Sequence, residues 1–393
     1  MATSYRHHWT LDPEVTFLNH GSYGACPGVI QNKQQALREE MEREPVRFMG
    51  HRHSLIDRAR EAAADFVGAR PSELAFVPNA TAGVNAALRS QRWKVGDQVL
   101  VTDHEYNACR NTLDYVAQRW GAEVVVVRIP YPLQSEEEVM TAMLDAVTSR
   151  TVFCLVDHLT SPTALRLPLE RLVPALQEKG IRVLVDGAHA PGQIPLSLQK
   201  LGADYYTGNF HKWACTPKGV AIFVAREDRH EDLHPAVISH GLNADTSHRS
   251  RFHQEFDWTG TFDPTAWGVV PETLTFMEGL MEGGWPAIMK RNHDLALEAR
   301  QDLCQQFGVS VPAPESMIGT MAGVPAPEDL AEDFWERDRN LYTELGNTWG
   351  IQIPVIPWIS GKQRHLILRF SVHLHNNRED YRKLAEAITS MRS

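Results

Sequence analysis

Short apolar runs recur along the first part of the chain, separated by longer and more charged stretches. Runs of this length are typical of strands, and unbroken runs are typical of strands buried on both faces of a parallel sheet. The four consecutive valines within residues 124–129 are the clearest case. The pattern predicts strands at residues 74–79, 98–102, 124–129, 152–156, 183–185, 203–206 and 219–225.

Helical patterns fill much of the chain between and after these runs. A heavily charged helix is predicted at residues 29–44, and another begins after Asn79. A long helix is predicted at residues 285–307, and an amphipathic helix at residues 378–391. This order of elements predicts an α/β protein with a doubly wound, mostly parallel sheet and a smaller C-terminal α/β domain.

Two segments lack a regular pattern. Residues 240–256 are polar and predict a long loop, of a kind that is often functional in compact domains. Residues 312–330 are rich in Pro, Gly and Ala and predict a connector within the smaller domain. We expect an N-terminal segment at residues 1–25 that packs with the small domain, a large domain at 26–270, and the small domain at 271–393.

Composition narrows the class of protein. The 393 residues suffice for about two domains, and 43% hydrophobic with 22% charged residues is an ordinary globular mixture. The net charge is −10 without a strongly basic run, so nucleic-acid binding is not expected. No signal-peptide core or apolar run of about 20 residues occurs, so no membrane partner is expected. Five cysteines without CxxC spacing predict reduced thiols in a cytoplasmic protein, with no disulfide framework and no metal site.

Asp186 and Lys212 are the strongest candidates for chemistry. Asp186 follows the apolar run 183–185, and Lys212 lies just past the run 203–206. Ligands of open α/β sheets bind at the carboxyl ends of strands, so both side chains are expected at one rim. There a lysine can form a Schiff base with pyridoxal phosphate while an aspartate keeps the pyridine nitrogen protonated. Alone, Asp186 also fits a helix cap and Lys212 a solvated surface, but three neighbours favour the functional interpretation: His189, Asn209 and His211.

A phosphate site is predicted where the strand at 74–79 turns into a helix. Small residues there let the backbone approach a ligand, and a helix N-terminus presents unpaired N–H groups. Ala80 and Thr81 lie in this first turn, and Thr81 adds a hydroxyl. Asn79 also fits a plain helix cap, and both interpretations can hold.

The sequence D-G-A-H at 186–189, followed by G-N-x-H-K-W at 208–213, resembles the class V aminotransferase family of fold-type I pyridoxal phosphate enzymes. The nearest branch is that of isopenicillin N epimerase and its relatives, which include cysteine and cysteine-sulfoxide lyases. The resemblance extends from Asn19 to Arg369. It implies the fold-type I architecture and pyridoxal phosphate as cofactor.

The resemblance also implies cofactor contacts. Tyr106 takes the position where many members have a histidine over the pyridine ring, which favours stacking over proton transfer. Ser161 stands near the position, often Asn, that meets the phenolic oxygen. Thr261 matches a residue that reaches the phosphate of the partner subunit, which implies a homodimer with shared sites; alone, Thr-Gly-Thr fits a turn.

Four residues are implied to meet the substrate. Asn19 and His20 match an N-terminal segment that crosses the mouth of the site near the substrate carboxylate, although the residues alone fit an ordinary turn. Arg47 matches a region that contributes to the partner's site, or it belongs to a solvated basic face. Arg369 matches the arginine that clamps the substrate α-carboxylate, for which a guanidinium fork is suited.

Several reactions begin with removal of the same α-hydrogen. Local likeness favours an amino-acid epimerase, with a C–S β-lyase or an aminotransferase as alternatives. A desulfurase needs a cysteine on a mobile loop beyond the lysine, and the last cysteine here, Cys304, lies in a helical segment. A non-catalytic scaffold is less expected because the cofactor-facing positions are filled.

Overall fold

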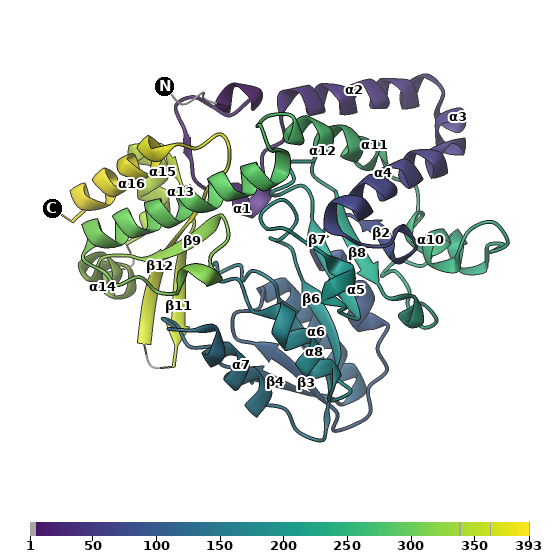
Figure 1. The fold of residues 1–393 in the computed structure, drawn as a ribbon, viewed down its shortest axis with the longest axis horizontal. Helices are drawn as coiled ribbons and strands as arrows, with labels where there is room; N and C mark the ends of the chain where they lie inside the picture. Colours follow the sequence, from purple (N-terminus) through teal and green to yellow (C-terminus); the bar gives the residue numbers. More distant parts are fainter. Residues whose placement is uncertain (1–4, 338, 362, 393) are drawn as a thin grey trace.

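A seven-stranded sheet forms the centre of the larger part of the molecule (Figure 1). The computed structural model describes residues 5–337, 339–361 and 363–392. Across the sheet the strands follow the order β2 (Leu74–Val77), β8 (Ala221–Ala225), β7 (Tyr205–Asn209), β6 (Arg182–Asp186), β5 (Thr151–Asp157), β3 (Gln98–Thr102) and β4 (Glu123–Val127). The strands from β7 to β4 run parallel, whereas β8 is antiparallel to both of its neighbours. The predicted α/β fold with a mostly parallel sheet is confirmed.

The central strands are buried on both faces. In β6, Val183 and Val185 enter one apolar cluster and Leu184 enters another. Successive side chains of a strand point to opposite faces, so the two clusters cover the two faces of the sheet. The valine run in β4 was expected to be buried on both faces, and this was wrong: β4 lies at the sheet edge, and Val126 is 44% exposed.

Helices cover the sheet and build the remainder of the large part (Figure 1). Here the described helices are α1 (His20–Tyr23), α2 (Gly28–Arg43), α3 (Pro45–Gly50), α4 (Arg52–Val67), α5 (Ala80–Arg89), α6 (Asn107–Trp120), α7 (Glu136–Asp145), α8 (Leu169–Gln177), α9 (Leu198–Leu201), α10 (Arg251–Phe256), α11 (Thr265–Gly268) and α12 (Val270–Glu278). None of the helices in the described part of the chain combines the length and apolar character needed to cross a bilayer.

The smaller part, at the left of Figure 1, is built on an antiparallel sheet in the order β11 (Val355–Ser360), β12 (Gln363–Ser371) and β9 (Met321–Pro325). Its helices are α13 (Gly284–Phe307), α14 (Glu328–Arg337), α15 (Leu341–Trp349) and α16 (Arg378–Ser390). The N-terminal strand β1 (Thr16–Phe17) pairs in parallel with β10 (Ile351–Gln352). The N-terminal segment is thus tied to the last quarter of the chain.

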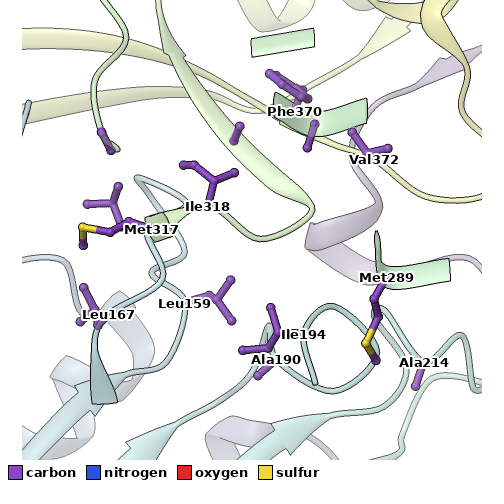
Figure 2. Packing of buried hydrophobic residues seen from close by; sticks show 14 of the residues in the cluster. Leu159, Leu167, Ala190, Ile194, Ala214, Met289, Met317, Ile318, Phe370 and Val372 are labelled. Atoms are coloured by element: carbon purple, nitrogen blue, oxygen red, sulfur yellow. The ribbon is translucent and has the colours of Figure 1, made fainter. Parts of the chain in front are cut away.

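One apolar cluster joins the two parts (Figure 2). Leu159 and Leu167, which follow β5, belong to the same cluster as Met317 and Ile318, which precede β9. Burial of shared apolar surface is the main stabilising term available to such an interface. It holds β12 in a fixed place relative to the large sheet.

Two segments differ from the sequence prediction. Residues 240–256 are not wholly loop, because Ser250 caps α10 by accepting a hydrogen bond from His253 N–H, and Phe252 and Phe256 are buried. Residues 312–330 are not only a connector, because 321–325 form β9. Gly323 and Pro325 masked this strand, which is held by pairing with the distant β12.

The strand order indicates where on the sheet a ligand would bind. The chain runs from β3 outward to β4 and then crosses back to β5, so the winding direction reverses beside β3. Ligands bind outside the carboxyl ends of strands at such a reversal. Four predicted residues follow or end the strands there: Tyr106, Ser161, Asp186 and Asn209.

Candidate active site

Asp186 is the last residue of β6, and its side chain is buried. The Cys109 thiol donates to its Oδ2 across 3.1 Å, and Ala188 N–H donates to its Oδ1 across 2.9 Å. Burial raises the pKa of the Asp186 carboxyl, while these two hydrogen bonds and nearby Lys212 act to lower it. Burial also raises the pKa of the Cys109 thiol, so Cys109 remains a donor. Both carboxyl oxygens of Asp186 therefore accept hydrogen bonds from within the protein.

Two more buried carboxyl groups lie beside Asp186, and neither was predicted as part of the site. Asp157 ends β5 opposite Asp186 in the strand register, and Glu105 follows β3. Burial raises the pKa of both carboxyls, and neighbouring carboxylates raise it further. Burial beside one another thus favours the neutral form of these two carboxyl groups. Both carboxyl residues follow apolar runs in the sequence, and this position is the feature that could have indicated them.

Glu105, Cys109 and Asp186 lie close enough together to share a metal ion. Metal ligands must give up their protons, however, and burial raises the pKa of Glu105 and of the Cys109 thiol well above the usual values. The arrangement suits a hydrogen-bonded cluster better than a metal site.

Lys212 lies in the turn after β7, only partly accessible to solvent. Burial, and secondarily the charge of Arg369, lowers the pKa of Lys212 to about 7. Its Nζ is 3.1 Å from Nε2 of His189, whose Nδ1 faces the Trp213 Nε1–H at 3.5 Å. This pairing places the His189 proton on Nε2, where it can donate to a neutral amine. The neutral form of the Lys212 amine, which can act as a base or a nucleophile, is therefore accessible near neutral pH.

The first turn of α5 is where the phosphate site was predicted, and part of its hydrogen-bonding capacity is used within the protein. Asn79 caps the helix by accepting from Ala82 N–H, and Asn209 Oδ1 accepts from Ala80 N–H across 2.8 Å. Ala80 N–H is therefore used within the protein, and Asn209 fixes the end of β7 to α5. Among the hydrogen bonds of the described residues, the Thr81 hydroxyl and N–H remain available for an anion. Ala80 contributes through its small size.

Arg369 on β12 is buried among neutral partners. It donates to the Ser161 carbonyl, to Ser161 Oγ at 3.1 Å and to Ser22 Oγ at 3.1 Å, and Ser22 in turn donates to Asn19 Oδ1 across 2.6 Å. Its Nε is buried without a partner, and no carboxylate of the described residues forms an ion pair with it. Burial lowers the pKa of Arg369 to about 10, so it still carries its charge at neutral pH. A buried cation without a counter-charge is suited to an anionic ligand group.

The structure connects Asn19 and Ser161 to Arg369. Asn19 is linked to Arg369 through Ser22, which was not among the residues predicted for the site. The two oxygens of Ser161 accept hydrogen bonds from Arg369. Its expected place near a cofactor oxygen stays a prediction.

Two histidines make main-chain contacts that the sequence did not predict. His20 was expected near the substrate carboxylate, yet its ring is buried, with Nε2 2.9 Å from the Lys212 carbonyl oxygen and Nδ1 3.0 Å from His375. That ring has no nitrogen free for a substrate. His211 was expected at the cofactor, and its Nδ1 lies 3.0 Å from the carbonyl oxygen of Val220, which closes the turn.

Three predicted residues are exposed in this chain. Tyr106 precedes α6, and its side chain is 48% exposed at the rim. Arg47 lies on α3 and pairs with Glu44 across 3.0 Å. Thr261 lies in the segment after α10. Stacking by Tyr106 and contributions of the other two to a partner's site stay predictions.

Comparisons with known proteins agree with this geometry. The family model "Aminotransferase class-V" matches residues 16–384. Isopenicillin N epimerase of Amycolatopsis lactamdurans is 32% identical, with 97% of this chain and 96% of the relative covered. L-cysteine desulfhydrase of Arabidopsis thaliana is 29% identical, with 99% and 90% covered.

Solved structures share the fold. The cystine C–S lyase C-DES, in a lysine-to-alanine mutant with glycine covalently linked to its pyridoxal phosphate, superposes with a TM-score of 0.79 at 20% identity, covering 98% of this chain and 99% of that one. A cysteine desulfurase from Thermococcus onnurineus has the same TM-score at 16% identity, with 100% and 98% covered. The chain belongs to the class V aminotransferase family, a family of pyridoxal phosphate-dependent enzymes.

Proposed function

We propose that this protein removes the α-proton of an amino acid with pyridoxal phosphate, as an epimerase of the isopenicillin N epimerase kind. The alternatives are a C–S β-lyase acting on cysteine or cysteine sulfoxide, and an aminotransferase. The observation that carries the proposal is a lysine amine with a pKa of about 7, whose surroundings include the Asp186 carboxyl and the Arg369 guanidinium.

The residues at the rim fit the cofactor. Thr81 at the start of α5 suits the phosphate, Asp186 the ring nitrogen, and Lys212 the aldehyde. When bound, pyridoxal phosphate supplies an electron-withdrawing ring that accepts the electrons left when the α-hydrogen departs. Asp186 keeps the ring nitrogen protonated, which sustains that withdrawal.

Lys212 and Arg369 divide the work on the substrate. Lys212 Nζ, a neutral amine at its lowered pKa, takes the proton from Cα as general base. Arg369 binds the α-carboxylate and so fixes the direction of the Cα–H bond. The charge of Arg369 helps to lower the pKa of Lys212, so the residue that binds the carboxylate also tunes the basicity of the amine.

The cysteines count against a desulfurase. All five are buried: Cys26, Cys109, Cys154, Cys215 and Cys304. A thiol that must attack a substrate sulfur needs an accessible position and thiolate character. The epimerase and desulfhydrase relatives agree with reactions that need no such thiol.

An amino-acid panel in heavy water tests the proposal. An epimerase incorporates deuterium at Cα with inversion and no keto acid. A β-lyase releases keto acid with a sulfur product, and an aminotransferase releases keto acid beyond one equivalent per cofactor only with an acceptor. Lys212→Ala should abolish exchange, and Asp186→Ala should still take up the cofactor but lose most exchange. A wild type that stays colourless with pyridoxal phosphate would instead support a non-catalytic scaffold.

The assembly and location belong to the same proposal. A homodimer in which Arg47 and Thr261 serve the partner's site accounts for their exposure in one chain. Unpaired cysteines are consistent with the reducing cytoplasm. The pairing of β1 with β10 supports a division into an N-terminal segment at 1–25, a cofactor-binding domain at 26–270 and a small domain at 271–393.

A further inference from the structure

Two buried histidines contact the main chain of the Lys212 turn, and a third reaches it through one of them. His20 Nε2 is 2.9 Å from the carbonyl oxygen of Lys212, and His373 Nε2 is 3.3 Å from that of Trp213. His375 reaches the turn through His20, because its Nε2 is 3.0 Å from His20 Nδ1. These contacts join residues up to 355 positions apart in the sequence.

The partners fix where the protons lie. A carbonyl oxygen can only accept, so His20 carries its proton on Nε2 and donates to Lys212. Its Nδ1 is then an acceptor, and the proton of His375 lies on Nε2 and donates to it. Burial lowers the pKa of both rings well below the usual value, which keeps them neutral. A chain of two hydrogen bonds therefore runs from His375 through His20 to the Lys212 main chain.

A metal ion is the competing explanation, since His20, His373 and His375 lie close enough together to ligate one. The rings of His20 and His373 are stacked, 4.2 Å apart and 17° from parallel. Imidazole lone pairs lie in the ring plane, so stacked rings do not point at one ion. Cys215 lies 3.4 Å from His373, but burial raises the pKa of its thiol well above the usual value, so it keeps its proton. The geometry favours hydrogen bonding.

The chain of hydrogen bonds also starts close to the strand that carries Arg369. His375 follows β12 by four residues, and Ser371 at the end of β12 accepts from Gly21 N–H across 3.0 Å. On the other side, a Cβ at Gly24 would lie 2.9 Å from Cα of Lys212, so the N-terminal segment is pressed against the turn. The N-terminal segment thus lies between β12 and the Lys212 main chain.

We propose that His20 and His375 are positioning residues, whose hydrogen-bond chain sets the Lys212 main chain relative to β12 and Arg369. The inference rests on the proposed function, in which Lys212 and Arg369 act on one substrate. A base misplaced by about 1 Å can cost about 100-fold in rate. We therefore expect the hydrogen bonds of His375 and His20 to affect the rate of proton transfer more than substrate binding.

The arrangement of protons is tested first, on cofactor-free protein. In two-bond ¹H–¹⁵N spectra of protein with ¹⁵N-labelled histidine, His20 and His375 should both show the Nε2–H form, assigned from His20→Gln and His375→Gln. His375→Phe should shift the His20 Nδ1 resonance, because it removes the donor and keeps a ring. A His20 proton on Nδ1, or one bound metal ion per chain that is lost in His375→Phe, overturns the proposal.

Kinetics then tests the consequence. In cofactor-loaded protein, His375→Phe should lower kcat for α-hydrogen exchange about 10- to 100-fold with little change in KM. His375→Gln keeps a hydrogen-bond donor, so this variant should retain most of the wild-type kcat. His230→Phe is the matched control, since His230 also faces a backbone carbonyl, that of Ala225, at 2.9 Å and stacks on Phe252.

The two levels of the proposal fail differently. A wild type that takes up no cofactor would contradict the proposed function. The proton positions in the cofactor-free protein would still show whether the hydrogen bonds from His375 through His20 to Lys212 exist. A His375→Phe variant that loads cofactor and turns over at the wild-type kcat overturns only the positioning role.

Discussion

Arg369 is a buried cation whose hydrogen bonds go to hydroxyl and carbonyl oxygens rather than to a carboxylate. Such a charge is costly to bury unless a ligand supplies the counter-charge. Its neighbours Ser22 and Ser161 hold the fork in place from two segments far apart in the sequence. At the residue scale, this is the feature of the site that best suits the binding of an anionic ligand group.

We expect Arg369→Lys to raise KM and lower kcat while the cofactor absorbance stays intact. Lysine keeps the charge but loses the paired geometry of the guanidinium. The resulting fall in kcat/KM should correspond to a loss of about 2–4 kcal/mol of transition-state stabilisation. Arg364→Lys on the same strand is the control, because Arg364 is exposed and pairs with Glu336. If Arg369→Lys and Arg369→Ala both match the wild type, the carboxylate is bound elsewhere, and Arg47 of the partner subunit is the next residue to test.

The lowered pKa of Lys212 predicts how cofactor uptake depends on pH. Only the neutral amine attacks an aldehyde, so the uptake rate should be high above the pKa of about 7 and should fall as pH drops below it. Arg369→Met removes a charge that lowers this pKa, so the midpoint should move to higher pH. Stopped-flow absorbance after mixing cofactor-free protein with pyridoxal phosphate measures the rate. A wild-type midpoint near that of free lysine, about 10.4, would contradict the prediction.

Helix α5 carries the predicted phosphate cradle, and its place depends on close contact with β7. A Cβ at Gly83 would lie 2.8 Å from Cβ of Thr207, so only glycine lets the helix approach the strand this closely. Asn209 then fixes the first turn of the helix to the end of β7. Helix α5 thus keeps the predicted phosphate cradle aligned with the turn that holds Lys212.

Gly83→Ala should push the start of α5 away from β7. Overpacking of this kind costs about 1–3 kcal/mol, so we expect a lower free energy of unfolding in urea together with weaker retention of pyridoxal phosphate. Gly346→Ala is the control: a methyl group added to this helical glycine in α15 would meet nothing within 4 Å, and alanine there should be neutral or stabilising. Equal effects of the two changes would show that the close contact does not matter.

At the scale of the whole molecule, a core shared between the two parts holds β12 against the rim, while α3 and the segment around Thr261 remain exposed. The proposed homodimer would use these exposed segments to complete the partner's site. Thr261 is the residue with the clearest test, because its predicted ligand is the phosphate bound to the other chain.

Thr261→Ala should weaken cofactor retention by about 1.5–3 kcal/mol, the value of a hydrogen bond to a charged group. Mixed dimers of Thr261→Ala with Lys212→Ala chains decide whether the contact crosses the interface. If it does, the two changes fall in the same site of a mixed dimer, and the other site keeps an intact lysine and an intact threonine and binds cofactor with wild-type affinity. If Thr261 acts within its own chain, no intact site forms. Tight cofactor binding by a stable monomer would also contradict the shared site.

The sequence by itself determined the sheet and the two residues at its rim. Apolar runs predict strands locally, and the rule that ligands bind at strand carboxyl ends brings Asp186 and Lys212 together without knowledge of contacts. Helices with strong periodicity, such as α13 and α16, also followed from local pattern. The two motifs at 186–189 and 208–213 identified the family because they lie within one short stretch.

Only the tertiary structure decided the contacts between distant segments. β9 is held by pairing with β12, and Glu105 and Asp157 acquire raised pKa values because folding buries them beside Asp186. His20 turned from an expected substrate contact into a partner of the Lys212 main chain, because its neighbours come from distant parts of the sequence. Local pattern reports which face of an element is apolar, whereas a hydrogen bond across 355 positions, such as that between His20 and His375, depends on how the elements pack.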